Sequence, residues 1–240
     1  MEVGRQKAEV KKKAEVRKDE AGVTLIITLM ALLLMSAFGV GLLLLTATET
    51  RIAASFRDAQ AAFYAADAAA ERAMDDLLAV PDWNRLLDGS TRSSFVDGAP
   101  RGRRVLDDGS TVDLAQAVNM ANCHRVMACR DAEMDAVSDA RPWGPNNPRW
   151  TLFAYGRVRD LLPAGAIDSP FYVIVMIGDD PAETDNDPTR DGADGSPGAG
   201  VLAMRSEAFG PGGAHRIVEV TVARGAGAIR GLSWREIRQD

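Results

Sequence analysis

The stretch that decides the fold is VTLIITLMALLLMSAFGVGLLLL, residues 23–45, which contains no charged side chain. As an α-helix at about 1.5 Å per residue it spans roughly 34 Å, enough to cross a bilayer hydrocarbon core of about 30 Å. A helix buried inside a soluble domain is the alternative, but residues 23–45 are longer and more uniformly apolar than such a helix needs to be. The stretch therefore predicts a transmembrane helix.

A polar leader, residues 1–22, precedes the apolar stretch and ends at Gly22. It carries +2 of a total formal charge of −6, so the remainder of the chain carries −8. The positive-inside rule places this leader in the cytoplasm and the rest of the chain outside it. A secretory signal is cut after its apolar run, whereas here the small residue precedes the run. Cleavage after Gly22 would therefore keep the helix, with Val23 as its first residue.

The helix is expected to continue beyond the membrane segment as an amphipathic half. From residue 52 onward apolar side chains recur every three or four residues, and the charged side chains fall off this stripe. Abundant alanine favours helix and permits close packing, and the first proline after Val23 is Pro81. We therefore expect one helix over residues 23–80. The stripe consists of Ile52, Phe56, Ala59, Phe63, Ala66, Ala70, Met74 and Leu77.

The remaining chain divides by composition into a turn-rich part and a strand-rich part. Residues 81–148 are dense in Asp-Gly and proline turn signals, and they predict a small hairpin and a short helix within residues 114–134. Residues 149–240 predict an antiparallel sheet, and residues 229–238 at its end are expected to form a short closing helix or a frayed tail. The fold class is α+β, with the long N-terminal helix packed on the C-terminal sheet. The predicted strands are Arg149–Asp160, Phe171–Ile177, Val201–Phe209 and Arg216–Arg224.

The order of leader, apolar helix and amphipathic helix resembles the type IV pilin superfamily. Residues 46–69, TATETRIAASFRDAQAAFYAADAA, are similar to the N-terminal domain of PilX-type minor pilins. In that domain an E-x-R-x-A segment, here beginning at Glu49, and an R-x-x-x-x-A-F-x-A-A-x-A-A segment, here beginning at Arg57, follow the apolar helix. The resemblance covers residues 20–78. It implies a structural, non-catalytic minor pilin that helps to initiate the type IV pilus and caps its tip.

The resemblance also implies partners and processing. A prepilin peptidase would cut after Gly22 and N-methylate Val23, and Glu49 and Arg51 would pair with neighbouring subunits. The other partners would be further minor pilins, the major pilin and the inner membrane. The body would lie in the periplasm until assembly, and afterwards at the pilus tip on the cell surface.

One departure from the major pilins is informative. The resemblance implies that those pilins carry a glutamate at the fifth mature position, which neutralises the terminal amine of a neighbouring subunit. Here the fifth residue counted from Val23 is Ile27, and no acid occurs before Glu49. A neighbour's ammonium group beside Ile27 would stay unpaired in lipid, which is costly. This fits a tip subunit with no subunit above it.

Two other functions stay open at this point. A GspK-like tip pseudopilin of type II secretion would share the missing acid, although residues 81–148 are short and turn-rich for the large helical insertion of that family. An uncleaved bitopic membrane protein with an extracytoplasmic ligand-binding or adhesive domain is the other alternative. Two features argue against an enzyme: every lysine lies within the first eighteen residues, and the chain holds only two histidines. The acidic body argues against nucleic acid as a partner.

Two further groups of residues have candidate roles outside the membrane. Cys123 and Cys129 predict a small disulfide loop, which requires a break in any helix between them, because positions i and i+6 point to different sides. The loop 179–195 holds seven carboxylates and one basic side chain, a composition that suits either a solvated loop or a calcium site. Calcium is the only cofactor the sequence suggests. The candidate ligands are Asp179, Asp180, Asp185, Asp187, Asp191 and Asp194.

Overall fold

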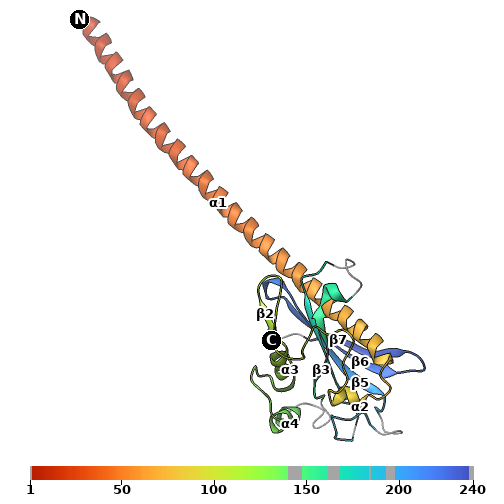
Figure 1. Cartoon of the computed structure of the whole chain (residues 1–240). Helices are drawn as coiled ribbons and strands as arrows, with labels where there is room; N and C mark the ends of the chain where they lie inside the picture. Colours follow the sequence, from red (N-terminus) through yellow and green to blue (C-terminus); the bar gives the residue numbers. More distant parts are fainter. Residues whose placement is uncertain (1, 140–147, 162–167, 184, 193–197, 238–240) are drawn as a thin grey trace. The chain divides into compact units, whose positions relative to one another are not determined.

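The computed structural model describes residues 2–139, 148–161, 168–183, 185–192 and 198–237. Its longest element is helix α1 (Glu2–Leu78), 77 residues long, which confirms a single helix through the apolar and amphipathic stretches (Figure 1). The helix begins within the leader and ends two residues before the expected boundary. The chain divides into two compact units, Met1–Ala54 and Ser55–Asp240, which are described separately below.

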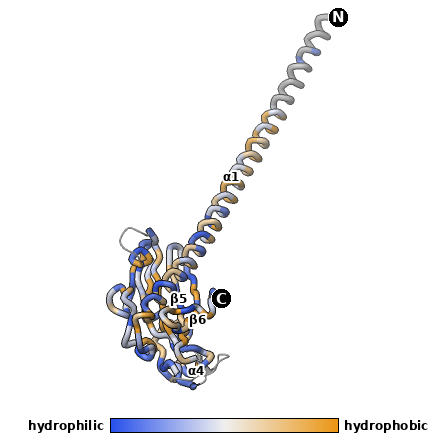
Figure 2. Tube along the Cα trace, turned by 90° about the vertical axis from the view of Figure 1, so that its right-hand side faces the viewer, coloured by the Kyte–Doolittle hydropathy of each residue, from blue (hydrophilic) through white to orange (hydrophobic). Residues whose placement is uncertain are grey.

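The first unit contains the polar leader and the apolar half of α1. Among the described residues, α1 from Gly22 onward is the one helix long and apolar enough to cross a membrane, and an 18-residue window in it has a mean hydropathy of 2.4. Figure 2 shows this apolar character along the helix. The polar side chains Thr28, Ser36, Thr46, Thr48 and Thr50 donate their hydroxyls to carbonyl oxygens four residues earlier. These side chains therefore satisfy their donors without water, as a membrane helix must.

The second unit is built on a five-stranded antiparallel sheet that follows chain order. The four predicted strands are confirmed. The expected helix or frayed tail at residues 229–238 is wrong, because this segment forms a fifth strand paired along its length with the fourth. The strands are β3 (Thr151–Arg157), β4 (Tyr172–Asp179), β5 (Val201–Phe209), β6 (His215–Arg224) and β7 (Ile229–Ile237).

The two edges of the sheet differ. Along β3, backbone groups of the preceding loop pair with the strand: Ser93 N donates to Phe153 O at 3.1 Å, and Tyr155 N donates to Phe95 O at 3.1 Å. At the other edge, no strand in the described part of the chain pairs with the outer side of β7. The side chains Leu232 and Trp234 of β7 are exposed, to 59% and 47%.

One face of the sheet packs on the C-terminal part of α1, as the α+β prediction requires (Figure 1). The helix contributes mainly alanines with exposed fractions of 0–1%, among them Ala62, Ala66 and Ala70. Small side chains let the helix lie close to the strands, and the hydroxyl of Ser206 on β5 donates to Ala66 O at 2.6 Å. Opposite them, the sheet presents Val173, Val175, Ile177, Leu202, Met204, Val218, Val220 and Val222.

The other face of the sheet is covered by the turn-rich part of the chain. The predicted hairpin is present as β1 (Arg103–Val105) and β2 (Thr111–Asp113), followed by helices α3 (Leu114–Cys123) and α4 (Asp131–Asp139). The single short helix expected within residues 114–134 is therefore two helices. The break lies at His124, whose φ of 55° is left-handed and ends α3. Leu114, Ala117 and Ala121 of α3 pack on Trp150, Tyr155, Tyr172 and Ile174 of the sheet side.

Candidate functional site

The apolar half of α1 is a candidate binding surface, because its large side chains are exposed. Those at residues 23–45 have exposed fractions between 56% and 73%. Val23 and Ile27, at the predicted mature terminus, are exposed to 57% and 61%. Gly22 is also exposed, and a Cβ added there would meet no atom within 4 Å. Gly22 and Val23 both lie within α1, so cleavage between them would shorten this helix.

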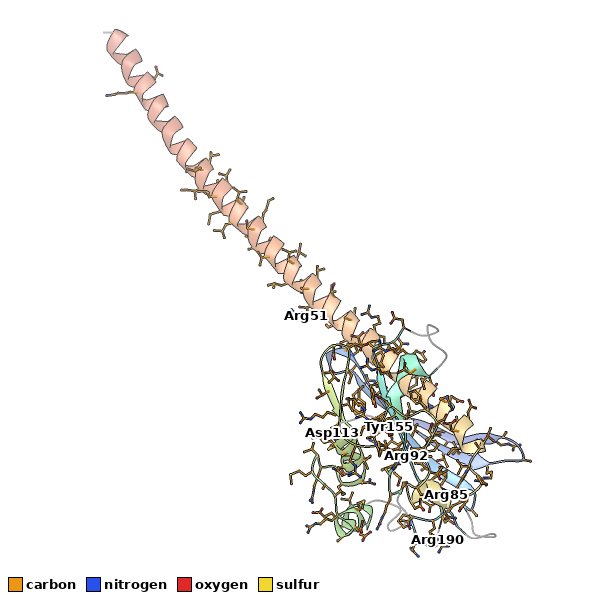
Figure 3. All side chains as sticks on the ribbon, viewed as in Figure 1. Arg51, Arg85, Arg92, Asp113, Tyr155 and Arg190 are labelled. Atoms are coloured by element: carbon orange, nitrogen blue, oxygen red, sulfur yellow. A yellow bond between two sulfur atoms is a disulfide. The ribbon has the colours of Figure 1, made fainter. Side chains whose placement is uncertain are left out.

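The residues that follow this half leave a second exposed surface on α1. Glu49 and Arg51 are exposed, and neither forms an ion pair with any other residue that the structure describes; Figure 3 marks Arg51 on the helix. Ile52 and Phe56 begin the amphipathic stripe, yet they are exposed to 64% and 71%. The stripe becomes buried only at Ala66, Ala70 and Leu77. Its first turns thus lack cover from the described part of the chain.

The structure joins Cys123 and Cys129 in a disulfide, with their Cα atoms 6.1 Å apart. Cys123 is the last residue of α3, and the left-handed His124 turns the chain immediately after it. The bridge therefore closes the link between α3 and α4. Arg125 and Arg130, which flank this link, both reach Glu133 of α4, at 2.8 Å and 3.4 Å.

The acidic loop brings three carboxylates together at the end of β4. One carboxylate oxygen each from Asp179, Glu183 and Asp191 lies within 4.8 Å of the other two. Asp179 and Glu183 are both 1% exposed, while Asp191 is half-buried. The Oδ1 atom of Asp179 is buried and accepts no hydrogen bond from any described residue.

Burial and mutual repulsion dominate the electrostatics of this cluster. Desolvation, followed by the negative charge of Glu183, raises the pKa of Asp179 to about 8. The pKa of Asp191 is also raised, mainly by desolvation, although a hydrogen bond from Gly200 and the charge of Arg224 act in the opposite direction. The chain therefore supplies less positive charge here than three ionised carboxylates require.

The other predicted ligands mostly stabilise turns of the acidic loop. Asp180 Oδ1 accepts from Ala182 N at 3.1 Å, and Asp185 Oδ1 accepts from Asp187 N at 2.9 Å. Asp187 Oδ1 accepts from both the backbone N and the hydroxyl of Thr189. Asp194 lies outside the described residues. Of the predicted ligands the structure gathers Asp179 and Asp191, and it adds Glu183.

Glu183 belongs to the same acidic stretch but was not among the predicted ligands. The sequence holds a weak signal for it, because Asp179 and Glu183 are four residues apart with Pro181 between them. A turn at this proline brings the two carboxylates back toward each other. The Glu183 N–H donates to Asp180 O at 3.0 Å across that turn.

The acidic loop is attached to the region where α1 ends. Asp191 N donates to the side-chain oxygen of Asn84 on α2 (Asn84–Leu87) at 3.0 Å. Asp191 Oδ1 accepts from Gly200 N at 2.7 Å, which closes the loop just before β5. Figure 3 shows Arg85 and Arg190 at this same end of the body.

A second polar group, not predicted from the sequence, lies on the sheet face opposite α1. Arg205 bonds Glu207 at 2.6 Å and Glu219 at 2.9 Å, and Glu219 also meets Arg235 of β7 at 2.5 Å. Burial alone would raise the pKa of Glu207, but hydrogen bonds and the charges of His215 and Arg205 lower it overall. The alternating signs make this a cross-strand ion network that stabilises the sheet.

A long apolar helix followed by an antiparallel sheet is a pilin-like arrangement. Residues 21–71 match the protein family model described as PilX N-terminal. The matched segment includes Gly22, Glu49, Arg51 and the first buried alanines of α1, and it indicates a type IV pilus minor pilin. No curated protein and no solved structure matches the chain. The PilX-type family is structural, and its members contact other pilus components and the membrane.

Proposed function

We propose that this chain initiates assembly of the type IV pilus and then caps its tip, without catalysing a reaction. In this proposal prepilin peptidase cuts between Gly22 and Val23 and methylates the new terminus. The body stays in the periplasm, held by the inner membrane, until minor pilins and the major pilin assemble beneath it. The match of residues 21–71 supports the pilin class, and the exposed helix supports assembly through it.

The observation that carries the tip position is the apolar fifth residue. Ile27 is 61% exposed and surrounded along the helix by further apolar side chains. A subunit placed above this one would present its terminal ammonium to this surface, where no carboxylate is available until Glu49. An unpaired charge in an apolar environment is strongly unfavourable. The subunit therefore accepts neighbours on one side only.

The exposed pair Glu49 and Arg51 has a proposed role in subunit contacts. Both side chains project from α1 without an ion-pair partner among the described residues, so both charges are available to neighbouring helices. Reversing either charge should lower assembly, and exchanging the two should restore part of it. Equal assembly by all these variants would remove the pair from the interface.

The tip position is tested by counting copies along a pilus. Immunogold labelling of the wild-type protein should mark pilus ends only. Ile27→Glu supplies the missing carboxylate and should add label along the fibre. Ile26→Glu, at a neighbouring position of equal exposure (59%), is the matched control and should not. Label along the whole wild-type fibre would contradict the proposal.

Processing is tested separately at Gly22. Gly22→Ala should leave the unprocessed chain as a slower band on a gel, because the peptidase requires the glycine. Gly39→Ala is the matched control: it changes the same atom in the same helix, and neither added Cβ meets an atom within 4 Å. Normal processing of Gly22→Ala would favour the uncleaved bitopic protein instead.

The GspK-like alternative receives no support from the described body. Between residues 81 and 139 the described helices are 4, 10 and 9 residues long, which is not a large helical insertion. The genes next to this one, for a pilus or for a secretion system, would decide between the two.

A further inference from the structure

We propose that Asp179, Glu183 and Asp191 bind one Ca²⁺ ion, which fastens the acidic loop to the end of β4. The cluster alone would not establish a site, since acidic groups often gather without a metal. The second observation is Asp179 itself, whose side chain is 1% exposed and whose Oδ1 accepts no hydrogen bond from a described residue. The inference concerns the body alone and does not depend on the proposed role in the pilus.

The position of Asp179 shows why a ligand is needed. A buried polar atom without a partner is unfavourable, and more so when it is charged, so native proteins rarely keep one. Asp179 forms no ion pair with a described residue; its carboxylate has a backbone hydrogen bond from Asp180 and lies beside the other two carboxylates. Its Oδ1 atom therefore lies where a positive group would be favourable.

The spacing of the three oxygens suits Ca²⁺. Two oxygens bound to one Ca²⁺ at about 2.3–2.6 Å can be at most about 5 Å apart. The three oxygens here lie within 4.8 Å of one another, so small movements of the side chains would bring all of them within reach of one ion. For Mg²⁺, at about 2.1 Å, the same limit is about 4.2 Å, and its octahedral geometry is less tolerant.

The chemistry of the donors also favours a hard divalent cation. All three side chains are carboxylates, and the described cluster contains neither a cysteine nor a histidine, the ligands that zinc prefers. Three carboxylates leave several of the six to eight positions of Ca²⁺ for water and carbonyl oxygens. Such a site is of the extracellular kind, with a dissociation constant of about 10⁻⁴ M.

The ion would act beyond the loop itself. The backbone N–H of Asp191 donates to the side-chain oxygen of Asn84 on α2. Its Oδ1 accepts from the backbone N–H of Gly200, just before β5. Nearby, Arg224 lies over the ring of Trp83 at 4.3 Å and donates to Pro81 O, just beyond the end of α1. Binding of the ion therefore ties the loop, the sheet and the end of α1 together.

The test uses the full chain in detergent micelles, melted in EGTA, in about 10 mM Ca²⁺ or in the same concentration of Mg²⁺. With Ca²⁺ about a hundredfold above its dissociation constant, the melting temperature should rise by about 5–10 °C. Mg²⁺ should give less than half this rise. Isothermal titration should find one Ca²⁺ per chain.

Two variants with the same change of side chain, Asp to Asn, separate the site from a general effect of the acidic loop. Asp179→Asn should weaken Ca²⁺ binding at least about tenfold, since losing even an outer-shell group costs about 10–100-fold. In EGTA it should melt no lower than the wild type, because the neutral amide carries neither the desolvation cost of a carboxylate nor its repulsion by Glu183. Asp187→Asn is the control: it lies in the same loop, and its Oδ1 can still accept from Thr189.

The outcomes divide clearly. Loss of the Ca²⁺-dependent rise in Asp179→Asn, with the rise kept in Asp187→Asn, supports the site. No rise in the wild type, an equal rise with Mg²⁺, or an equal loss in both variants overturns it. Because Asp179→Asn is expected to melt normally in EGTA, a folding defect in that variant would itself contradict the proposed role of Asp179.

Discussion

The two halves of α1 differ in how they use apolar residues. The first half carries large side chains such as Leu33 and Leu43, each more than 70% exposed. The second half carries alanines such as Ala66 and Ala73, which are 0% exposed beneath the sheet. In a single helix, the larger apolar surface is the one without cover from the described chain. Large apolar side chains therefore mark the half of α1 that is exposed, where lipid or other helices can bind. Alanines mark the half that packs on the sheet of the same chain.

The largest effect should come from removing a large buried side chain in the second half. Leu77→Ala, at a position 1% exposed, should lower the free energy of unfolding by about 2–5 kcal/mol through lost burial and a cavity. Thermal melts of the full chain in detergent would measure this. Leu33→Ala, at a position 72% exposed, should leave the melt unchanged. Equal destabilisation by both changes would break the distinction between the halves.

Overpacking should have the next largest effect. Ala66→Leu places a larger side chain where the helix meets Ser206 and the sheet, and should cost about 1–3 kcal/mol. Its melting temperature would show the cost. The partner change Ala37→Leu lies in the exposed half and should be neutral. A stable Ala66→Leu would mean that the alanines are not needed for the close approach of α1.

Acid should have a smaller effect, by weakening the hydrogen bonds that join the second half of α1 to residues 93 and 94. Asp76 on α1 accepts hydrogen bonds from the Ser93 hydroxyl, from Arg72 and from Ser94 N. Burial raises the pKa of Asp76, but these hydrogen bonds outweigh it, so the folded pKa lies below the usual 3.8. The stabilisation is therefore complete above pH 3.8 and is lost as the pH falls through the lower, folded value.

The measurement for this effect is the melting temperature between pH 6 and pH 2. The wild type should lose stability in the acid part of this range, and Asp76→Asn should be less stable at pH 6 with a weaker dependence on pH. Parallel curves for the two proteins would show that Asp76 does not contribute to the acid response.

The smallest effect on stability should come from the exposed start of the stripe. Phe56→Ser, at a position 71% exposed, should change the free energy of unfolding by no more than about 0.5 kcal/mol. It should nevertheless reduce co-purification with other pilins, if this surface meets neighbouring helices. Tyr64→Ser, at an aromatic position off the stripe and 59% exposed, is the control. Unchanged co-purification of Phe56→Ser would place the contact elsewhere.

Much of the fold could be predicted because its signals are local. The apolar residues of α1 predict a helix, and the β-branched residues of β4 and β6 predict strands, without knowledge of the rest of the chain. The strand β7 could not be predicted this way, because its sequence IRGLSWREI mixes charged residues with a glycine. It is a strand because β6 offers a long ladder of backbone partners, and its side chains stay largely exposed. Tertiary pairing outweighed the local signal.

The sequence predicted that this loop is acidic, but it did not predict which of its carboxylates lie together. The number of carboxylates identifies the loop. It does not distinguish a carboxylate that could bind a metal from one that accepts a hydrogen bond within a turn. Asp185 and Asp187 close turns on nearby backbone N–H groups, whereas Glu183 returns toward Asp179. That choice depends on the path of the backbone between Asp179 and Asp191, which residue types alone do not determine.

The unequal edges of the sheet limit how copies of this chain can associate. The loop along β3 uses backbone groups of that side, so in the described part of the five-stranded sheet the edge open to a further strand is the one beside β7. Two copies meeting there would each use up the other's free edge, and the combined sheet would end in two β3 sides. In the described part of the five-stranded sheet, backbone pairing between copies would therefore close at a dimer; in the proposed pilus role, contacts between subunits would then fall to the exposed part of α1.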